Sequence, residues 1–109
     1  MRNIVLIGMP SSGKTTIGKK IADELSLDFF DSDEEIVKNE GREIREIFET
    51  DGEKYFRTIE SNVIAELSKK QSSVISTGGG AVLDKKNIDR LHQNGFIVFI
   101  DRPIELLVS

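Results

Sequence analysis

The sequence contains no cysteine, no tryptophan, two prolines and a single histidine. Without cysteine, the chain can form neither disulfide bonds nor thiolate metal sites. One histidine does not make a metal constellation, so we expect His92 to be structural. No apolar run approaches the roughly 20 residues of a transmembrane helix, and the first residues lack the pattern of a signal peptide. We therefore expect a cytoplasmic protein with no membrane partner.

Basic residues are also scarce relative to acidic ones, at 15 against 19, which gives a formal net charge of -4. A general nucleic-acid-binding domain would carry a basic face, so we expect no nucleic-acid partner. Any polyanionic ligand must then be bound by a local cluster of cations and backbone N–H groups. The 109 residues, 38% of them hydrophobic, are enough for one domain with a modest core.

Short apolar runs alternate with helical patterns along the chain. The patterns predict strands at 4–7, 27–30, 73–76 and 96–100, and helices at 14–25, 32–41, 44–51, 53–69, 88–94 and from 103 onward. Ser32 and Glu35 have the spacing of a capping box, which predicts that Ser32 caps its helix. Strands that alternate with helices form parallel βαβ units, so the sequence indicates a layered α/β fold with a parallel sheet.

Residues 8–15 read GMPSSGKT, which matches the phosphate-binding pattern G-x-x-x-x-G-K-[ST] between an apolar strand and a helix. Its backbone N–H groups and the helix start favour phosphate oxygens. Lys14 would contact the β and γ phosphates, and the Thr15 hydroxyl would bind Mg²⁺. The alternative is an ordinary glycine-rich turn. The predicted phosphate-binding residues are Ser11, Ser12, Gly13, Lys14, Thr15 and Thr16.

Asp31 and Asp33 follow the second predicted strand, two residues apart. If the backbone there is extended, both carboxylates face the same side, at the end of the sheet where ligands bind in open α/β folds. One could hold Mg²⁺ through water, and the other could accept a hydroxyl proton. The alternative is that Asp33 only complements the start of its helix.

Arg57 and Glu60 lie three apart on the helix predicted at 53–69. Helical geometry turns Glu60 toward the buried stripe, where the carboxylate needs a cation that Arg57 can supply. A guanidinium held in this way suits a substrate carboxylate, although a purely structural ion pair is the alternative. The triplet 78–80 follows the third strand and could bring backbone N–H groups close to an anion, or it could be a flexible turn.

Four segments together resemble the shikimate kinases over the whole chain: GMPSSGKTT at 8–16, FFDSD at 29–33, DGEKYFRTIE at 51–60 and STGGGAV at 76–82. The resemblance implies a three-layer P-loop NTPase fold. It also implies ATP-dependent phosphorylation of the 3-hydroxyl of shikimate, on the route to chorismate and aromatic amino acids. Mg²⁺ is the implied cofactor, ATP and shikimate are the implied ligands, and we expect a monomer.

The resemblance also implies individual roles. Asp33 would bind the ring hydroxyls and act in catalysis with Lys14, and Arg57 would bind the carboxylate while Glu60 orients it. The helical segment 33–61 would bind substrate. The remaining implied residues are Gly79 and Gly80 for substrate, Thr15 for the metal, and Asp31 for a water-mediated metal contact.

The family continues into an arginine-bearing lid, another strand and an adenine-contacting loop, none of which follows in this sequence. We therefore expect residues 1–109 to be an incomplete kinase domain that is inactive alone. One alternative is a kinase of another small polyol acid, such as gluconate. A second alternative is a non-catalytic binding module of the same fold.

Overall fold

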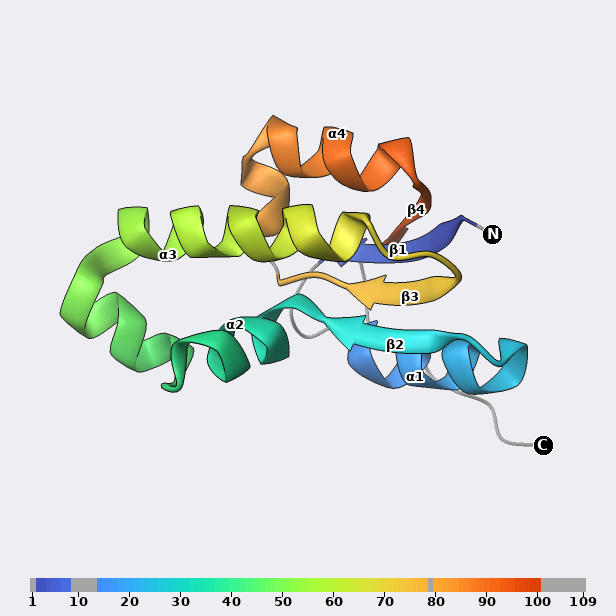
Figure 1. Cartoon of the computed structure of the whole chain (residues 1–109), viewed down its shortest axis with the longest axis horizontal. Helices are drawn as coiled ribbons and strands as arrows, with labels where there is room; N and C mark the ends of the chain where they lie inside the picture. Colours follow the sequence, from blue (N-terminus) through green and yellow to red (C-terminus); the bar gives the residue numbers. More distant parts are fainter. Residues whose placement is uncertain (1, 9–13, 79, 101–109) are drawn as a thin grey trace.

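The computed structural model describes residues 2–8, 14–78 and 80–100, which form a parallel sheet with helices on both faces (Figure 1). The elements in chain order are β1 (Asn3–Gly8), α1 (Lys14–Leu25), β2 (Asp28–Asp31), α2 (Ser32–Glu40), α3 (Ile44–Ser68), β3 (Ser73–Ser76), the 3₁₀ helix η2 (Ala81–Leu83), α4 (Lys85–Gln93) and β4 (Gly95–Ile100). All four predicted strands are confirmed. The helix predicted from 103 lies outside the described residues.

The sheet has the strand order β2-β3-β1-β4, with every neighbouring pair parallel. In register, Ile4 pairs with Val74 on one side and with Phe96 on the other. Since each parallel pair needs a crossover connection, the helices must lie over the faces of the sheet. All carboxyl ends of the strands therefore meet at one edge, where the loops that follow them come together.

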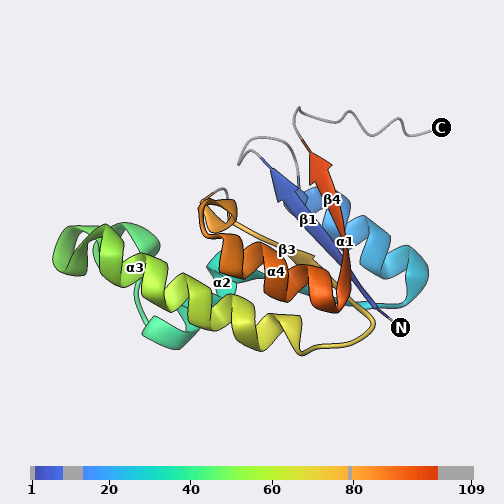
Figure 2. The same ribbon diagram turned by 90° about the horizontal axis from the view of Figure 1, so that it is seen from above.

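The two faces of the sheet have separate cores. Val5, Ile7 and Ile75 pack in a cluster with α3 and α4, whereas Leu6 and Val74 pack in a cluster with α1. This alternation follows from the period of two along a strand. Figure 2 shows α1 on one side of the sheet and α3 with α4 on the other. The predicted three-layer α/β fold is confirmed.

Helix α3 bends at Gly52, whose φ of 85° and ψ of 172° are not helical. A residue with a side chain rarely adopts this φ, so glycine suits the bend. The two helices predicted on either side of 51–52 are therefore confirmed as the two halves of α3. In the second half, the predicted stripe is buried at Phe56, Val63 and Leu67. With α2, the first half of α3 projects beyond the carboxyl ends of the strands (Figure 1).

At the opposite, amino end of the sheet, the Arg2 guanidinium donates to the His92 and Gly95 carbonyls, and the neutral amides of Asn3 and Asn94 make further hydrogen bonds. Asn3 is 1% exposed; its Nδ2 donates to the Lys70 carbonyl at 2.9 Å, and its Oδ1 accepts from the Ser73 N–H at 3.1 Å. Asn94 donates to the same Lys70 carbonyl at 2.8 Å. These contacts tie β1 to the turn that links α3 to β3. Across residues 2–8, 14–78 and 80–100, no helix has the length and apolar character needed to cross a membrane.

Candidate functional site

Thr15 and Asp31 bring the start of α1 to the carboxyl end of β2. The Thr15 hydroxyl donates to Asp31 Oδ2 at 3.1 Å, while Asp31 Oδ1 accepts from the backbone N–H groups of Asp33 at 2.9 Å and Glu34 at 3.2 Å. Asp31 is therefore the N-cap of α2. One carboxylate both stabilises a helix start and contacts Thr15, the last residue of the phosphate-binding pattern.

The capping box predicted at Ser32 and Glu35 is wrong, because the cap is one residue earlier. The Ser32 side chain is fully buried, and its hydroxyl accepts from the Gly78 N–H at 2.9 Å. The start of α2 is thereby joined to the loop after β3. From the sequence, an extended backbone was also considered at both Asp31 and Asp33. Only Asp31 is extended, because Asp33 lies in the first turn of α2.

Asp33 lies against the glycine-rich loop. A Cβ atom added to Gly78 would stand 2.5 Å from Asp33 Oδ1, so the carboxylate approaches this backbone more closely than a side chain there would allow. Asp33 is also near Glu60, since its negative charge contributes to raising the pKa of that residue. The structure thus brings β2–α2, the loop after β3 and the second half of α3 together.

Arg57 and Glu60 form the predicted ion pair, with Arg57 NH1 2.9 Å from Glu60 Oε1. The Glu60 side chain is 2% exposed. Burial is the largest cause that raises the pKa of Glu60; the hydrogen bond and charge of Arg57 act in the opposite direction. A Cβ atom on Gly80 would lie 2.2 Å from Arg57 NH1, so only glycine leaves room for the guanidinium here.

One aromatic ring lies beside Arg57, and a second ring packs against the first. Its guanidinium carbon is 5.3 Å from the centroid of the Phe56 ring, and the Phe48 ring is 4.7 Å from Phe56 at an interplanar angle of 32°. The sequence placed both phenylalanines on helix faces but did not connect them with this site. The feature of the sequence that could have indicated their role is their position, about one helical turn before and after the bend at Gly52.

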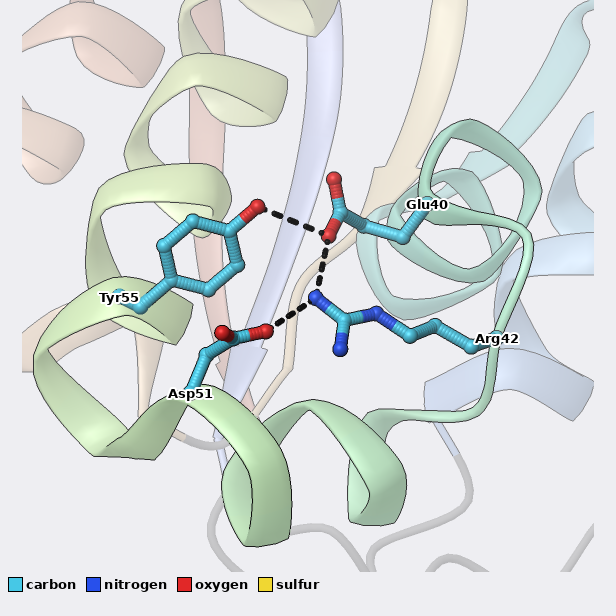
Figure 3. Close-up of polar contacts among 4 residues, drawn as sticks. All are labelled: Glu40, Arg42, Asp51 and Tyr55. Atoms are coloured by element: carbon cyan, nitrogen blue, oxygen red, sulfur yellow. Dashed lines mark hydrogen bonds and ion pairs between the residues drawn. The ribbon is translucent and has the colours of Figure 1, made fainter.

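A second polar cluster, which the sequence did not predict, joins α2 to both halves of α3 (Figure 3). Arg42 pairs with Asp51, and also with Glu40 at 3.1 Å, while the Tyr55 hydroxyl donates to the same Glu40 oxygen at 3.1 Å. Hydrogen bonds to Asp51 and then Glu40 raise the pKa of Arg42, and the bond to Glu40 raises that of Tyr55. Because Tyr55 lies two residues before Arg57, this cluster helps to set the position of Arg57 relative to α2.

Part of the predicted phosphate-binding and substrate-binding set falls outside residues 2–8, 14–78 and 80–100. Ser11, Ser12, Gly13 and Gly79 lie outside the described residues, as does the side chain of Lys14, whose backbone begins α1. Thr16 is exposed on the first turn of α1.

The predicted Mg²⁺ ligands have the right chemistry for that ion. Thr15 donates its hydroxyl proton to Asp31, so the lone pairs of its Oγ1 remain available to a cation. Mg²⁺ prefers oxygen ligands and usually combines one or two protein groups with phosphates and waters. Within the described part of the chain, no group of three or more histidine, aspartate or glutamate side chains could hold a metal ion by itself. The residues therefore fit a metal that arrives with a phosphate ligand.

A pocket of about 370 Å³ adjoins the ion pair, and its lining includes Arg57, Glu60, Gly80 and Asn87. Another hollow, of about 400 Å³, lies over α1 and is mainly apolar, with Lys20 and Glu24 as its charged residues. Of the predicted substrate residues, Arg57 and Gly80 line the first pocket, whereas the second has neither. The Arg57–Glu60 pair and the close approach of the guanidinium to Gly80 make the first pocket the candidate site.

A family model described as shikimate kinase matches residues 10–109. The shikimate kinases of Caldicellulosiruptor bescii and Clostridium botulinum are each 49% identical to this chain over 109 residues. Both matches cover the whole of this chain. They cover only 63% and 64% of the two relatives, so the chain spans less than two thirds of their length.

Solved structures agree with the sequence relatives. The shikimate kinase from Acinetobacter baumannii in complex with shikimate has a TM-score of 0.91 and 42% identity, covering 94% of this chain and 57% of that one. The shikimate kinase from Aquifex aeolicus has a TM-score of 0.88 and 44% identity, and the match covers 93% of this chain and 60% of that one. A gluconokinase from Sinorhizobium meliloti has a TM-score of 0.53 and 21% identity, with 90% of this chain and 56% of that one covered. This likeness shows a shared fold alone.

Proposed function

This chain belongs to the shikimate kinase family, and from that premise we propose that the protein carrying it transfers the γ-phosphoryl group of ATP to the 3-hydroxyl of shikimate. The observation that carries the proposal is the ion pair between Arg57 and the buried Glu60, beside Asp33. It offers a fixed cation and a carboxylate within one site, as a hydroxylated acid would require. The products are shikimate 3-phosphate and ADP.

Arg57 binds the substrate carboxylate in this proposal. Glu60 accepts a hydrogen bond from NH1 of the guanidinium, which limits the rotation of the guanidinium and leaves NH2 for the substrate. A planar guanidinium can then grip a carboxylate through two parallel hydrogen bonds. Gly79 and Gly80 also bind the substrate in this proposal, and the Phe48 and Phe56 rings border the carbon skeleton of a cyclic substrate.

Asp33 accepts the proton of the attacking hydroxyl. As that proton leaves, the hydroxyl oxygen forms a bond to the γ-phosphorus, and the bond from this phosphorus to the β–γ bridging oxygen breaks. The electron pair of the broken bond remains on ADP. The close contact of Asp33 with Gly78 keeps the carboxylate in one place for this transfer.

The nucleotide binds at 8–16 in this proposal. Ser11, Ser12, Gly13, Lys14 and Thr16 contact the phosphates, while Thr15 holds Mg²⁺ directly and Asp31 holds it through water. When bound with ATP, Mg²⁺ neutralises charge on the phosphate oxygens. The hydrogen bond between Thr15 and Asp31 supports this assignment because it keeps the two oxygens adjacent.

Steady-state kinetics on the intact protein test the proposal, with ATP–Mg²⁺ and either shikimate or gluconate as acceptor. We expect shikimate-dependent ADP release and little turnover of gluconate.

Asp33→Asn should lower kcat about 10²- to 10⁴-fold, because an amide cannot accept the proton. Arg57→Ala should instead raise the KM for shikimate about ten- to a hundredfold, because it removes a charge-assisted contact. Faster turnover of gluconate than of shikimate would overturn the assignment. An Asp33→Asn effect confined to KM would remove the general-base role.

A further inference from the structure

Asn87, in the first turn of α4, is a buried side chain that uses only part of its hydrogen-bonding capacity. It is 1% exposed, and its Nδ2 donates to the Ala81 carbonyl at 3.0 Å. Only the amide nitrogen can donate to a carbonyl oxygen, so this contact fixes which way the amide points. The other end of the amide, Oδ1, is buried without a hydrogen-bond partner among the described residues.

Arg57 has the complementary unpaired atom. Its Nε is likewise buried without a hydrogen-bond partner in the described part of the chain. Both residues line the same pocket of about 370 Å³. Buried polar atoms are almost always hydrogen-bonded, and because these two atoms belong to residues that line one pocket, a single bridging group can account for both.

The chemistry of the two atoms restricts what can satisfy both. Asn87 Oδ1 needs a donor, and Arg57 Nε needs an acceptor. A carboxylate could serve only Arg57, and an ammonium group only Asn87. A hydroxyl-bearing molecule, either water or a ligand with a hydroxyl group, donates and accepts through one oxygen and can bridge the two.

We propose that Asn87 is a positioning residue for Arg57, acting through one such bridging oxygen in this pocket. The guanidinium is planar, so holding Nε as well as NH1 fixes the plane in which its remaining N–H groups point. The bond from Nδ2 to Ala81 also steadies the turn that carries Gly80, against which the guanidinium lies. The proposal rests on the proposed function only for the identity of the anion.

A double-mutant cycle on the intact protein tests whether Asn87 acts through Arg57. The variants are Asn87→Leu, Arg57→Lys and their combination, and Asn87→Ser replaces Asn87→Leu if the latter does not fold. We expect Asn87→Leu to raise the KM for shikimate about tenfold when Arg57 is present, the size of a hydrogen bond to a charged group. In the Arg57→Lys background, the same change should raise KM less than about twofold. The kcat value and the KM for ATP should change little.

A urea-unfolding cycle with the same variants, performed without substrate, separates the two sources of the bridging oxygen. Non-additive effects without substrate identify water, and non-additivity that appears only in shikimate binding identifies a ligand hydroxyl; either result supports the proposal. Additive effects in both cycles would overturn it. If the wild-type protein fails to phosphorylate shikimate, the unfolding cycle still tests Asn87, so the two failures are distinguishable.

Two further variants sharpen the test. Asn87→Asp keeps an acceptor at Oδ1 but loses the donor to Ala81, so it should destabilise the protein while retaining coupling to Arg57. Asn3→Leu is the matched control because Asn3 is equally buried, and both ends of its amide are hydrogen-bonded at the far end of the sheet. It should leave the KM for shikimate unchanged. A tenfold rise in that KM for Asn3→Leu would mean that any buried asparagine produces the effect.

Discussion

Asn3 and Asn87 are equally buried, but they lie at opposite ends of the sheet and differ in hydrogen bonding. At the amino end, the Nδ2 and Oδ1 atoms of Asn3 both have backbone partners. At the carboxyl end, Asn87 is paired through one atom only and lines the pocket beside Arg57 and Glu60. Side chains whose polar atoms are all hydrogen-bonded within the protein suit a region whose role is to hold strands together. Charged side chains, and polar atoms that have no hydrogen-bond partner among the described residues, suit a region that binds a ligand.

The two ends also differ in buried charge, although Arg2 donates to the His92 and Gly95 carbonyls at the amino end. Neutral amides and backbone groups make the contacts of Asn3 and Asn94 that join β1, α3 and β3. The carboxyl end instead gathers Asp31, Asp33, Arg57 and Glu60, with Glu60 almost fully buried. Burying charge costs stability unless it is well paired, so this region is less stable than an apolar one could be. We therefore expect mutations at the carboxyl end to affect substrate binding more than stability, and mutations at the amino end to do the reverse.

Gly80→Ala should give the largest effect that tests this contrast. The backbone of Gly80, with φ −90° and ψ −5°, suits alanine, but the new methyl group would meet the Arg57 guanidinium. Since the guanidinium ends a flexible side chain, Arg57 will move and the backbone will not. We expect the KM for shikimate to rise about ten- to a hundredfold, as for loss of a charge-assisted contact, with a smaller change in kcat.

Gly41→Ala is the control for that variant. Gly41 has a φ of 71°, and a Cβ atom there meets nothing within 4 Å. Alanine should therefore cost about 1 kcal/mol of stability through backbone strain, with no change in the KM for shikimate. An unchanged KM in Gly80→Ala, measured beside a normal fold, would show that Arg57 does not bind substrate.

Asn3→Leu should sharpen the contrast from the other end. The change leaves the buried Ser73 N–H and the Lys70 carbonyl without the Asn3 amide. We expect the free energy of unfolding to fall by about 2 kcal/mol, measured by urea unfolding, while kcat/KM for shikimate stays within about twofold. A loss of activity without a loss of stability would break the distinction between the two ends.

Features set by nearby residues could be predicted from the sequence. The strands follow apolar runs, and the Arg57–Glu60 pair follows from a spacing of three on one helix, so both were found. The bend at Gly52 was likewise visible as a break between two helical patterns. In each case the signal lies in the identity and spacing of residues close together in the sequence.

Features set by distant residues could not be predicted in this way. The capping-box spacing selected Ser32, but the hydroxyl of Ser32 is bonded to Gly78, 46 residues later. With Ser32 engaged there, Asp31 supplies the cap. Asn87 carried no signal in the sequence, because its importance depends on sharing a pocket with Arg57. Such contacts follow from the order of the strands, which the local pattern does not determine.

Glu60→Gln should have the smallest effect and shows whether burial or pairing dominates at the carboxyl end. The pKa of Glu60 is raised from 4.5, mainly by burial, so the folded state binds this proton more tightly than the unfolded state. The contribution of Glu60 to stability is then fully present below pH 4.5 and is lost as the pH rises through the raised pKa. Glutamine does not titrate, so the stability of Glu60→Gln relative to wild type should increase over that window, by about 1.4 kcal/mol for each unit by which the pKa is raised. Urea unfolding of both proteins from pH 4.5 to pH 7 measures this difference. If the wild type instead gains stability relative to Glu60→Gln as the pH rises, the ion pair with Arg57 outweighs burial, and the carboxyl end is stabilised by its charges.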